Sequence, residues 1–360
     1  MKPLRIAYVV NVFPKLSESF IANEIAEVWR RGHEVIILSR RHPTETIRHP
    51  IVEQAGLDAV TVYNQHDFES ALEKFQPDLI HAHFATRATG CARELATKLR
   101  IPFTFTAHRY DIYDKAPQDW YQRAMDAAGV ITVSQANIDY INQQFGVPKD
   151  YMQLIPCGVN TELFSPNAAS INDIPLIVCV ARLHPVKNLS LLLRACANLR
   201  ERGVLFKCVI IGEGDEREKL EAEHQQLNLG YFLKLIGAQD QHQVCQWWKL
   251  ADIGVLTSHS EGMPVSLMEA ASCGVPVVTT GVGGIPEMVD HNKTGLITAD
   301  NDLGAFTDAL ELLVCDSALR QRMSIAARSK AEQHFSVEHQ VDQMVNLWQS
   351  VVYQEQVVCA

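Results

Sequence analysis

Short, almost wholly apolar runs alternate along the chain with stretches in which apolar residues recur at helical spacing. Strands that are buried on both faces of a parallel sheet have such continuous apolar runs. In the first half the runs are LRIAYVV, EVIILS, LIHAHF, FTFTA and GVITVS. From residue 175 the alternation starts again, with PLIVCVA, FKCVIIG, FLKLIG, ADIGVLTS, VPVVTT and TGLIT. The pattern predicts an α/β protein with two Rossmann-like, doubly wound domains, whose ligand sites lie at the carboxyl ends of the strands.

A polar, turn-rich segment over 150–175, with prolines at 156, 166 and 175, joins the two series. We place the domain boundary there, with the first domain over 1–165 and the second over 166–340. The second domain has 13 of the 19 glycines, as expected if its loops surround a ligand closely. Residues 341–360 have an apolar stripe at helical spacing and no strand after them, so they predict a C-terminal helix that packs back on the first domain.

Composition and charge exclude several classes of protein. The 360 residues are 47% hydrophobic, which is typical of a globular chain, and their net charge of -10 argues against a dedicated nucleic-acid binder. The nine cysteines are scattered without any C-x-x-C pair, so a disulfide scaffold or a zinc module is not expected. Scattered free thiols are instead typical of a protein in the reducing cytoplasm, which is the compartment we expect. The apolar runs are shorter than the about 20 residues of a membrane-spanning helix. The N-terminus, MKPLRIAYVV, predicts a strand rather than a secretory signal.

The densest group of candidate site residues lies in HSEGMPVSLMEAASCGVPVVTTGVGGIPEMV, over 259–289. Its middle, 264–273, predicts a helix with Pro264 in its first turn and a glycine after its end. Glu261 precedes this helix and Glu269 lies about one and a half turns along it, so we expect both carboxylates to border one cleft. The free N–H groups of the helix N-terminus favour an anion. A second backbone-lined loop follows, with glycines at positions 281, 283 and 284.

Two further loops follow predicted strands of the second domain. In VARLHPVKNLS, Arg182 and Lys187 lie between a strand and a leucine-rich helix, and two cations in that place predict a diphosphate site. In VIIGEGDEREKLE, Gly212 and Gly214 lie between a strand and a charged helix. The third glycine of a dinucleotide fingerprint is missing, so this loop is interpreted as a nucleoside-binding turn at most.

Histidines mark the strand ends of the first domain. His108 directly follows the strand FTFTA, while His81 and His83 lie at the end of LIHAHF. His108 with Asp111 is either acid–base machinery or an oriented polar cap, and the sequence leaves both interpretations open. The acidic triplet DND at 300–302 precedes a helical stretch, so we interpret it as a helix cap rather than a metal site.

Four motifs occur in one order and spacing, namely R-L-x-x-x-K-N, G-E-G-x-x-R, S-E-G-x-P-x-S-L-x-E-A-x-x-x-G-x-P-V-V and G-G-x-P-E. In this combination the chain resembles the retaining nucleotide-sugar glycosyltransferases of family 4, which have the GT-B fold. The resemblance covers essentially the whole chain. The opening F-P-K-L-S-E-S-F-I-x-N-E-I, with HAHF and I-P-C-G-V-N, is similar to bacterial exopolysaccharide glycosyltransferases of the colanic-acid and amylovoran type.

The resemblance implies a role for each candidate residue. Arg182 and Lys187 would hold the diphosphate and stabilise the leaving nucleotide, so that no metal is required. Glu269 would bind the ribose hydroxyls, Glu261 and the backbone N–H groups after it would hold the sugar, and His108 would contact the sugar near its anomeric centre. The implied catalytic residues are His108, Glu261, Arg182 and Lys187. The implied nucleotide-sugar-binding residues are Arg182, Lys187, Gly212, Gly214, Ile236, Glu261, Gly262, Met263, Pro264, Val265 and Glu269.

The resemblance also implies the reaction. The donor would be a nucleotide-diphosphate sugar, for which we expect a UDP-linked hexose. Transfer would retain the anomeric configuration by a front-face route in which the leaving phosphate helps to deprotonate the acceptor. No carboxylate would serve as a covalent nucleophile, in contrast to retaining hydrolases. The first domain would bind the acceptor, a saccharide on a polyprenyl-diphosphate carrier at the cytoplasmic face of the membrane.

Five arginines support a peripheral contact with that membrane. They lie close together in the sequence, where they either attract anionic lipid or form a solvated face without a partner membrane. These residues are Arg30, Arg31, Arg40, Arg41 and Arg48.

The chain departs from the family pattern at two places. The loop after the first strand, NVFPKLS, lacks the paired glycines of many members, so Lys15 or Ser17 would have to replace their phosphate contact. Cys157 stands where relatives often have asparagine. The rival interpretations are a GT-B phosphorylase or epimerase-like enzyme, a NAD-dependent dehydrogenase and a non-catalytic nucleotide-sugar-binding protein. The dehydrogenase is disfavoured because no strand leads into G-x-G-x-x-G.

Overall fold

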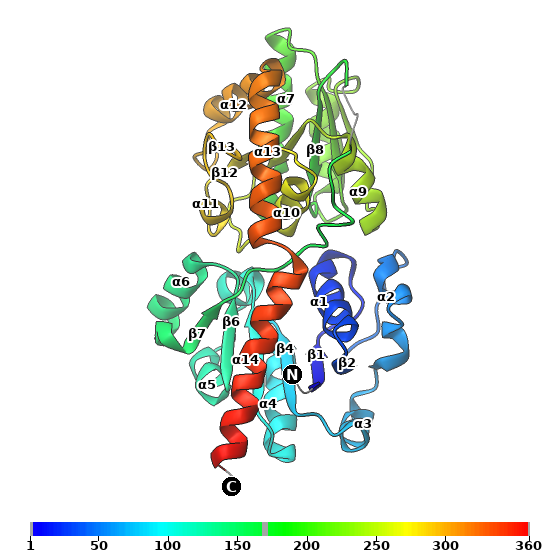
Figure 1. Cartoon of the computed structure of the whole chain (residues 1–360). Helices are drawn as coiled ribbons and strands as arrows, with labels where there is room; N and C mark the ends of the chain where they lie inside the picture. Colours follow the sequence, from blue (N-terminus) through cyan, green and yellow to red (C-terminus); the bar gives the residue numbers. More distant parts are fainter. Residues whose placement is uncertain (1–2, 168–171, 359–360) are drawn as a thin grey trace. The chain divides into compact units, whose positions relative to one another are not determined.

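The computed structural model describes residues 3–167 and 172–358, and the chain divides into two compact units (Figure 1). The first unit comprises Met1–Gly158 and Val337–Ala360, and the second comprises Val159–Ser336. The division therefore falls earlier than the predicted boundary after residue 165, and the returning helix begins at Val337 rather than at 341. Backbone pairing explains the shift, because the Val159 N–H donates to the Phe335 carbonyl at 2.8 Å and thereby ties both crossing segments to the second unit.

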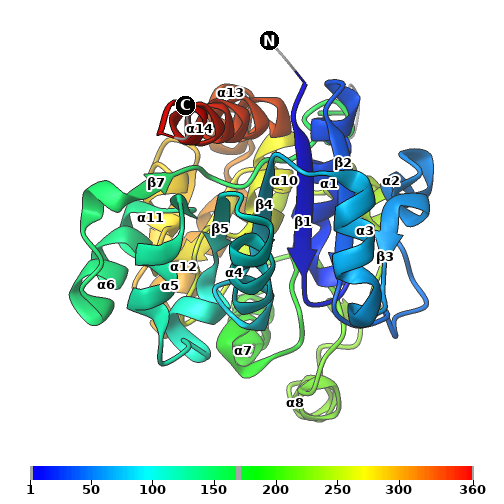
Figure 2. The same ribbon diagram turned by 90° about the horizontal axis from the view of Figure 1, so that it is seen from below.

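The first unit is built on a seven-stranded, wholly parallel sheet in the order β3-β2-β1-β4-β5-β6-β7. Figure 2 shows β1, β4 and β5 side by side. The strands are β1 (Arg5–Val10), β2 (Glu34–Ser39), β3 (Thr61–Val62), β4 (Leu79–His83), β5 (Phe103–Ala107), β6 (Gly129–Thr132) and β7 (Met152–Leu154). The helices are α1 (Ser19–Arg30), α2 (Pro50–Gln54), α3 (Phe68–Phe75), α4 (Arg87–Leu99), α5 (Trp120–Asp126), α6 (Gln135–Phe145) and α14 (Val337–Val358).

Alternation along the strands determines which side chains meet which helices. On β1, Ala7 and Val9 pack with α3 to α6, whereas Ile6 and Tyr8 pack on the opposite face with α1 and α14. On β4, His81 and His83 have the same alternation as Leu79, which faces α1 and α14. The predicted return of the C-terminal helix to the first unit is therefore present, and this helix covers the histidine-bearing face of the sheet.

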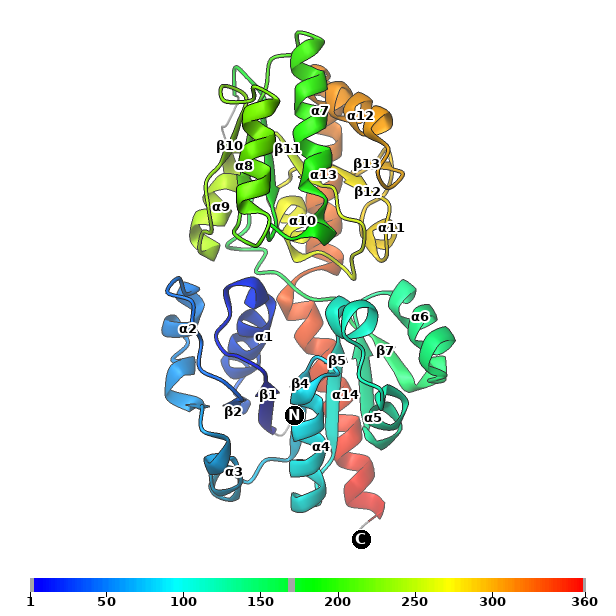
Figure 3. The ribbon, with the colours of Figure 1, turned by 180° about the vertical axis from the view of Figure 1, so that it is seen from behind.

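The second unit has a six-stranded parallel sheet in the order β10-β9-β8-β11-β12-β13. Its strands are β8 (Leu176–Val180), β9 (Lys207–Ile211), β10 (Leu233–Leu235), β11 (Ile253–Leu256), β12 (Val277–Thr280) and β13 (Gly295–Thr298). Helices α7, α8 and α12 lie on one side of this sheet, and α9, α10 and α13 on the other (Figures 1 and 3). The helices are α7 (Leu189–Glu201), α8 (Arg217–Gln226), α9 (Gln241–Leu250), α10 (Val265–Ser272), α11 (Ile285–Met288), α12 (Leu303–Cys315) and α13 (Ser317–His334).

Both sheets reverse their strand order once, between β1 and β4 in the first unit and between β8 and β11 in the second. Ligands of open α/β sheets bind at such switch points, outside the carboxyl ends of the strands. Each unit thus has the Rossmann-like architecture that the sequence predicts. Among the described residues, no helix combines the length and the apolarity needed to cross a membrane.

Candidate active site

The predicted phosphate-binding residues lie at the switch point of the second unit. The loop between β8 and α7 contains both Arg182 and Lys187, and Asn188, directly before α7, has a left-handed conformation with φ of 46°. The loop after β11 lies beside it, since the Thr257 hydroxyl donates to the Lys187 carbonyl at 2.9 Å and the His259 N–H donates to the Val186 carbonyl at 2.8 Å. Strand order therefore places the two predicted motifs together.

Lys187 and Glu261 form an ion pair across these loops. The Lys187 ammonium donates to Glu261 Oε1, which also accepts from the Ser258 hydroxyl at 2.6 Å. The side chains are only 15% and 6% exposed, so water screens the pair weakly. The predicted phosphate-binding cation and sugar-binding carboxylate thus stabilise each other.

Arg182 has the opposite environment. Its side chain is exposed and makes no ion pair or hydrogen bond with any other part of the chain that the structure describes. Its backbone, by contrast, is closely packed, because a Cβ on Gly212 would lie 1.9 Å from the Ala181 carbonyl oxygen and one on Gly214 would lie 2.3 Å from that of Leu183. The G-E-G glycines therefore let their loop pack directly on the arginine loop.

A second glycine loop supports Glu261. Gly283 has φ of +53°, and a Cβ there would lie 1.8 Å from the Glu261 carbonyl oxygen. The sequence predicted a backbone-lined loop at this position, and the structure shows that its glycine is required for contact with the carboxylate loop.

The acidic triplet at 300–302 is engaged in structural contacts. Asp302 caps α12 by accepting from the Ala305 N–H at 2.9 Å, as the helix-cap interpretation predicts. Asp300 accepts from His259 Nδ1 at 2.9 Å.

Glu269 has different neighbours from Glu261. It lies on α10, which begins at Val265, one residue after Pro264, and its carboxyl is buried close to Trp248 and Cys245 of α9. Burial raises the pKa of the Glu269 carboxyl to about 8, so it is largely protonated at neutral pH.

The remaining predicted residues lie near these loops in the second unit. Gly262, Met263 and Pro264 are buried directly before α10, and Val265 begins the helix, whose first N–H groups have no partner within the helix. Ile236 follows β10, where its N–H donates to the Ile210 carbonyl at 3.0 Å. That N–H is therefore occupied, so the nucleotide contact that the sequence predicts for Ile236 would have to use its side chain or its carbonyl.

In the first unit, Asp111 supports the backbone beside His108 rather than its ring. The Asp111 carboxylate accepts from the His108 N–H at 2.9 Å and from the Ala85 N–H at 2.7 Å. Burial raises the pKa of Asp111 to about 7, although these hydrogen bonds oppose the shift. Of the two interpretations that the sequence left open, the structure supports the oriented polar cap.

The His108 ring instead bonds to His83. His108 Nε2 lies 3.2 Å from His83 Nδ1, and His83 Nε2 lies 3.2 Å from Glu24 Oε1. Glu24, a fully buried acid on α1, was not predicted from the sequence as a functional residue. The signal that could have found it is its position among Ile21, Ile25 and Val28, on the apolar side of an amphipathic helix.

The two positions that depart from the family pattern have structural environments. Lys15 pairs with Glu18 at 2.6 Å, while Ser17 is exposed at the start of the first helical turn. Cys157 is buried, which raises the pKa of its thiol, so the thiol stays protonated at neutral pH. Neither the Lys15–Ser17 loop nor the surroundings of Cys157 therefore adds an unpaired cation to Arg182 for phosphate binding.

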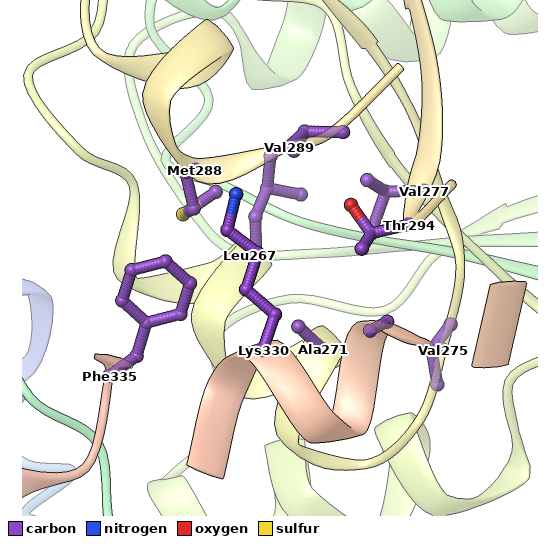
Figure 4. A pocket seen from close by; sticks show the side chains of 10 residues that line it. Leu267, Ala271, Val275, Val277, Met288, Val289, Thr294, Lys330 and Phe335 are labelled. Carbon is purple, nitrogen blue, oxygen red and sulfur yellow. The ribbon is translucent and has the colours of Figure 1, made fainter. Parts of the chain in front are cut away.

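The cavity in Figure 4 has a different lining from the predicted site. It lies in the second unit against α10 and α13, and its lining is mostly apolar. Its one lysine, Lys330, donates to the Asp290 carboxylate at 2.7 Å and to the Glu287 carbonyl at 3.1 Å. We therefore assign this cavity to helix packing.

Comparisons with known proteins agree with this geometry. The family model described as Glycosyltransferase Family 4 matches residues 17–163, and the model described as Glycosyl transferases group 1 matches residues 161–330. The putative colanic acid biosynthesis glycosyltransferase WcaL of Salmonella typhimurium is 25% identical over 97% of this chain and 100% of its own. The amylovoran biosynthesis glycosyltransferase AmsK of Erwinia amylovora is 33% identical over 53% of this chain and 49% of its own.

A solved structure shows the same fold. The crystal structure of Anabaena Alr3699/HepE in complex with UDP-glucose has a TM-score of 0.81 at 18% identity, covering 98% of this chain and 100% of that one. The two Rossmann-like units and the motifs at the β8–β11 switch point thus define a glycosyltransferase with the GT-B fold. The chain belongs to glycosyltransferase family 4.

Proposed function

We propose that this enzyme is a retaining, metal-independent glycosyltransferase that moves a hexose from a UDP-sugar to a saccharide acceptor. The acceptor is a lipid-linked intermediate of exopolysaccharide biosynthesis. The observation that supports this most strongly is the Lys187–Glu261 ion pair beside an unpaired Arg182, where β8 and β11 end. These are the side chains that a diphosphate and a sugar need, at the place where such sheets bind ligands.

The ion pair suggests how the donor is received. A bound diphosphate attracts the Lys187 ammonium, and Glu261 then becomes free to accept hydrogen bonds from sugar hydroxyls while Ser258 still holds it. The Arg182 guanidinium can bind two phosphate oxygens at once. As the bond between the sugar and the phosphate breaks, negative charge grows on the β-phosphate, and both cations stabilise it more strongly than they stabilise the substrate.

Relatives support the donor and the pathway class. WcaL is named for colanic acid biosynthesis and AmsK for amylovoran biosynthesis, and both products are polysaccharides. The HepE structure contains UDP-glucose. We extend these features to this chain as a UDP-hexose donor and an exopolysaccharide acceptor, and the first unit, with His108, is the proposed acceptor-binding domain.

A donor screen tests the proposal. We expect one or a few UDP-sugars, out of a panel of UDP-, GDP- and ADP-sugars, to be hydrolysed slowly without acceptor and to raise the thermal stability of the protein. EDTA should leave this turnover unchanged, because Arg182, Lys187 and the N-terminus of α10 supply the positive charge. Loss of activity in EDTA with recovery on adding Mg²⁺ or Mn²⁺ would refute metal independence.

The raised pKa of Glu269 predicts a proton release on nucleotide binding. Near neutral pH the free carboxyl is largely protonated, since its pKa is about 8, whereas ribose hydroxyls donate best to a carboxylate. UDP binding should therefore release a proton, measured by titration calorimetry in buffers of different ionisation enthalpy. The release should disappear well above a pH of 8 and in Glu269→Gln, which serves as the baseline for the titration of UDP itself. Equal release by parent and variant would remove Glu269 from the ribose site.

The proposed membrane contact depends on fewer cations than the sequence suggests. Arg30 and Arg31 both pair with Glu27, and Arg48 pairs with Asp58. Arg40 and Arg41 have no acidic partner among the described side chains. We therefore expect weak, salt-sensitive sedimentation with anionic vesicles that Arg40→Ser/Arg41→Ser abolishes. Unchanged binding by this double variant would exclude Arg40 and Arg41 as the lipid contact.

A further inference from the structure

A line of hydrogen-bonding groups crosses the interior of the first unit and ends at His108. It starts at the backbone of Gly158 and continues through Gln340 of α14, Glu24 of α1 and His83 of β4. Glu24 and His83 are fully buried, Gln340 is 4% exposed and His108 is 7% exposed. Two helices and two strand ends thus contribute to one continuous polar chain in the interior of the first unit.

The first link determines the direction of the chain. A backbone N–H can only donate, and the Gly158 N–H lies 2.6 Å from Gln340 Oε1. The amide orientation of Gln340 is therefore fixed, and its Nε2 donates to Glu24 Oε2 at 2.8 Å. Glu24 thus receives a hydrogen bond on the oxygen that faces α14.

The direction continues to His108. An ionised carboxylate only accepts, so the contact of 3.2 Å between Glu24 Oε1 and His83 Nε2 places a proton on that nitrogen. With its one proton on Nε2, the His83 ring accepts at Nδ1, which lies 3.2 Å from His108 Nε2. His108 therefore has its proton on Nε2 and a lone pair on Nδ1.

The surroundings keep His108 in this neutral form. Phe20 and Phe84 flank its ring, with centroid distances of 4.9 Å and 4.6 Å. Burial, with a smaller effect of His83, lowers the pKa of His108 well below its ordinary value. Within the described part of the chain, Nδ1 of His108 has no hydrogen-bond partner.

We propose that Glu24, His83 and Gln340 are positioning residues that hold His108 in the Nε2–H tautomer, so that Nδ1 accepts a hydrogen bond from a sugar hydroxyl. The proposal rests on the proposed function, in which His108 contacts the sugar. It explains why an acid on the apolar side of α1 and a glutamine of α14 are buried together. The returning C-terminal helix then contributes to the site through Gln340.

A metal ion is the competing explanation for part of this cluster. Ligand atoms of Glu24, His81 and His83 lie within 4.8 Å of one another. The ring nitrogens of His81 already have partners, however, since Nδ1 lies 2.8 Å from the Thr104 hydroxyl and Nε2 lies 3.2 Å from that of Thr106. The two explanations differ in one observable, because a metal bound at His83 Nε2 would displace the proton that the hydrogen-bonded chain requires.

Histidine tautomers in the wild-type enzyme test the proposal independently of activity. In protein labelled with ¹⁵N-histidine, we expect His83 and His108 each to show a protonated Nε2 and an unprotonated, pyridine-like Nδ1, with His83→Asn and His108→Asn used for assignment. A protonated Nδ1 on His108, or stoichiometric metal in the purified protein, would overturn the proposal. An enzyme that turns over no nucleotide sugar would refute the proposed function and leave this reading of the tautomers intact.

A one-atom exchange tests the link to catalysis. In Glu24→Gln, the new amide oxygen must face Gln340 Nε2, so its NH₂ faces His83 and reverses both tautomers. We expect kcat/KM to fall about 10- to 100-fold, the cost of replacing an acceptor with a donor at one sugar hydroxyl. UDP affinity should not change, because the nucleotide residues belong to the second unit. Glu27→Gln, one turn along α1 and paired with Arg30, is the matched control and should retain activity.

Exchanging the carboxylate of Glu24 with the amide of Gln340 should restore the direction of the hydrogen bonds toward His83 and His108. In Glu24→Gln/Gln340→Glu, the carboxylate at 340 accepts from Gly158 and from the new amide, whose oxygen again accepts from His83. We expect this double variant to regain the wild-type tautomers and most of the lost kcat/KM. Equal activity of Glu24→Gln and Glu27→Gln, or a double variant with wild-type tautomers and no recovery, would show that the chain does not act through His108.

Discussion

Replacing Arg182 with alanine is expected to lower kcat/KM by roughly 100-fold or more, a loss on the order of 3 kcal/mol in transition-state stabilisation. In the proposed mechanism the guanidinium faces charge that grows as the leaving nucleotide departs, so its effect should be larger in the transition state than in the bound substrate. Because the Arg182 side chain is exposed and unpaired, the same change should leave the thermal unfolding midpoint unaltered. Steady-state hydrolysis of the donor and a melting curve measure the two effects.

A matched control separates phosphate binding from general loss of charge. Arg194 is also exposed in the second unit, on α7, where its Nε donates to the Ser190 carbonyl of its own helix. Arg194→Ala should keep parental turnover. If Arg182→Ala retained activity within a few-fold of the parent, the assignment of the β8–α7 loop to the diphosphate would be wrong.

Replacing Lys187 with methionine should reduce both activity and stability. The ammonium is lost from the leaving group, so we expect a decrease in kcat/KM similar to that of Arg182→Ala. In addition, Glu261 remains buried without its counter-ion, which should lower the free energy of unfolding by about 3 kcal/mol. Arg182→Met, which breaks no ion pair, should leave the stability unchanged.

A double variant tests whether the two effects of Lys187 are separate. Lys187→Met/Glu261→Gln removes both charges, so the unfolding free energy should return most of the way to the parental value while activity stays low. Recovery of activity in the double variant would mean that Lys187 serves only to neutralise Glu261. Parental stability in Lys187→Met alone would show that the ion pair contributes nothing to the fold.

The sequence predicted those features that follow from local patterns. Continuous apolar runs predicted two parallel sheets, and the proline and glycine around 264–274 predicted α10 with an error of one residue at each end. Arg182, Lys187 and Glu261 were placed in loops after strands, and Glu269 on the helix that follows, because strand, loop and helix are adjacent in the sequence. Strand order then determined that the β8 and β11 loops meet, and no local pattern contains that information.

Long-range packing determined what the sequence did not predict. The bond between Glu24 and Gln340 joins residues 316 positions apart, and it depends on α1 and α14 covering the same face of the sheet. Likewise, the first unit ends at Gly158 rather than at the predicted residue 165, because Val159 pairs with Ser336 at the C-terminal end of the second unit. The pairing of Asp111 with two backbone N–H groups depends on the path of the loop after β5, which spacing alone does not define.

The anomeric configuration of the first product tests the central claim most directly. With EDTA present and no acceptor, the UDP-linked α-hexose that turns over fastest in the screen would be hydrolysed while proton NMR follows the released sugar, before it mutarotates. A retaining, metal-independent enzyme that uses Arg182 and Lys187 for the leaving diphosphate should release the α-anomer first. Initial release of the β-anomer, or no turnover until a divalent metal is added, would contradict the account.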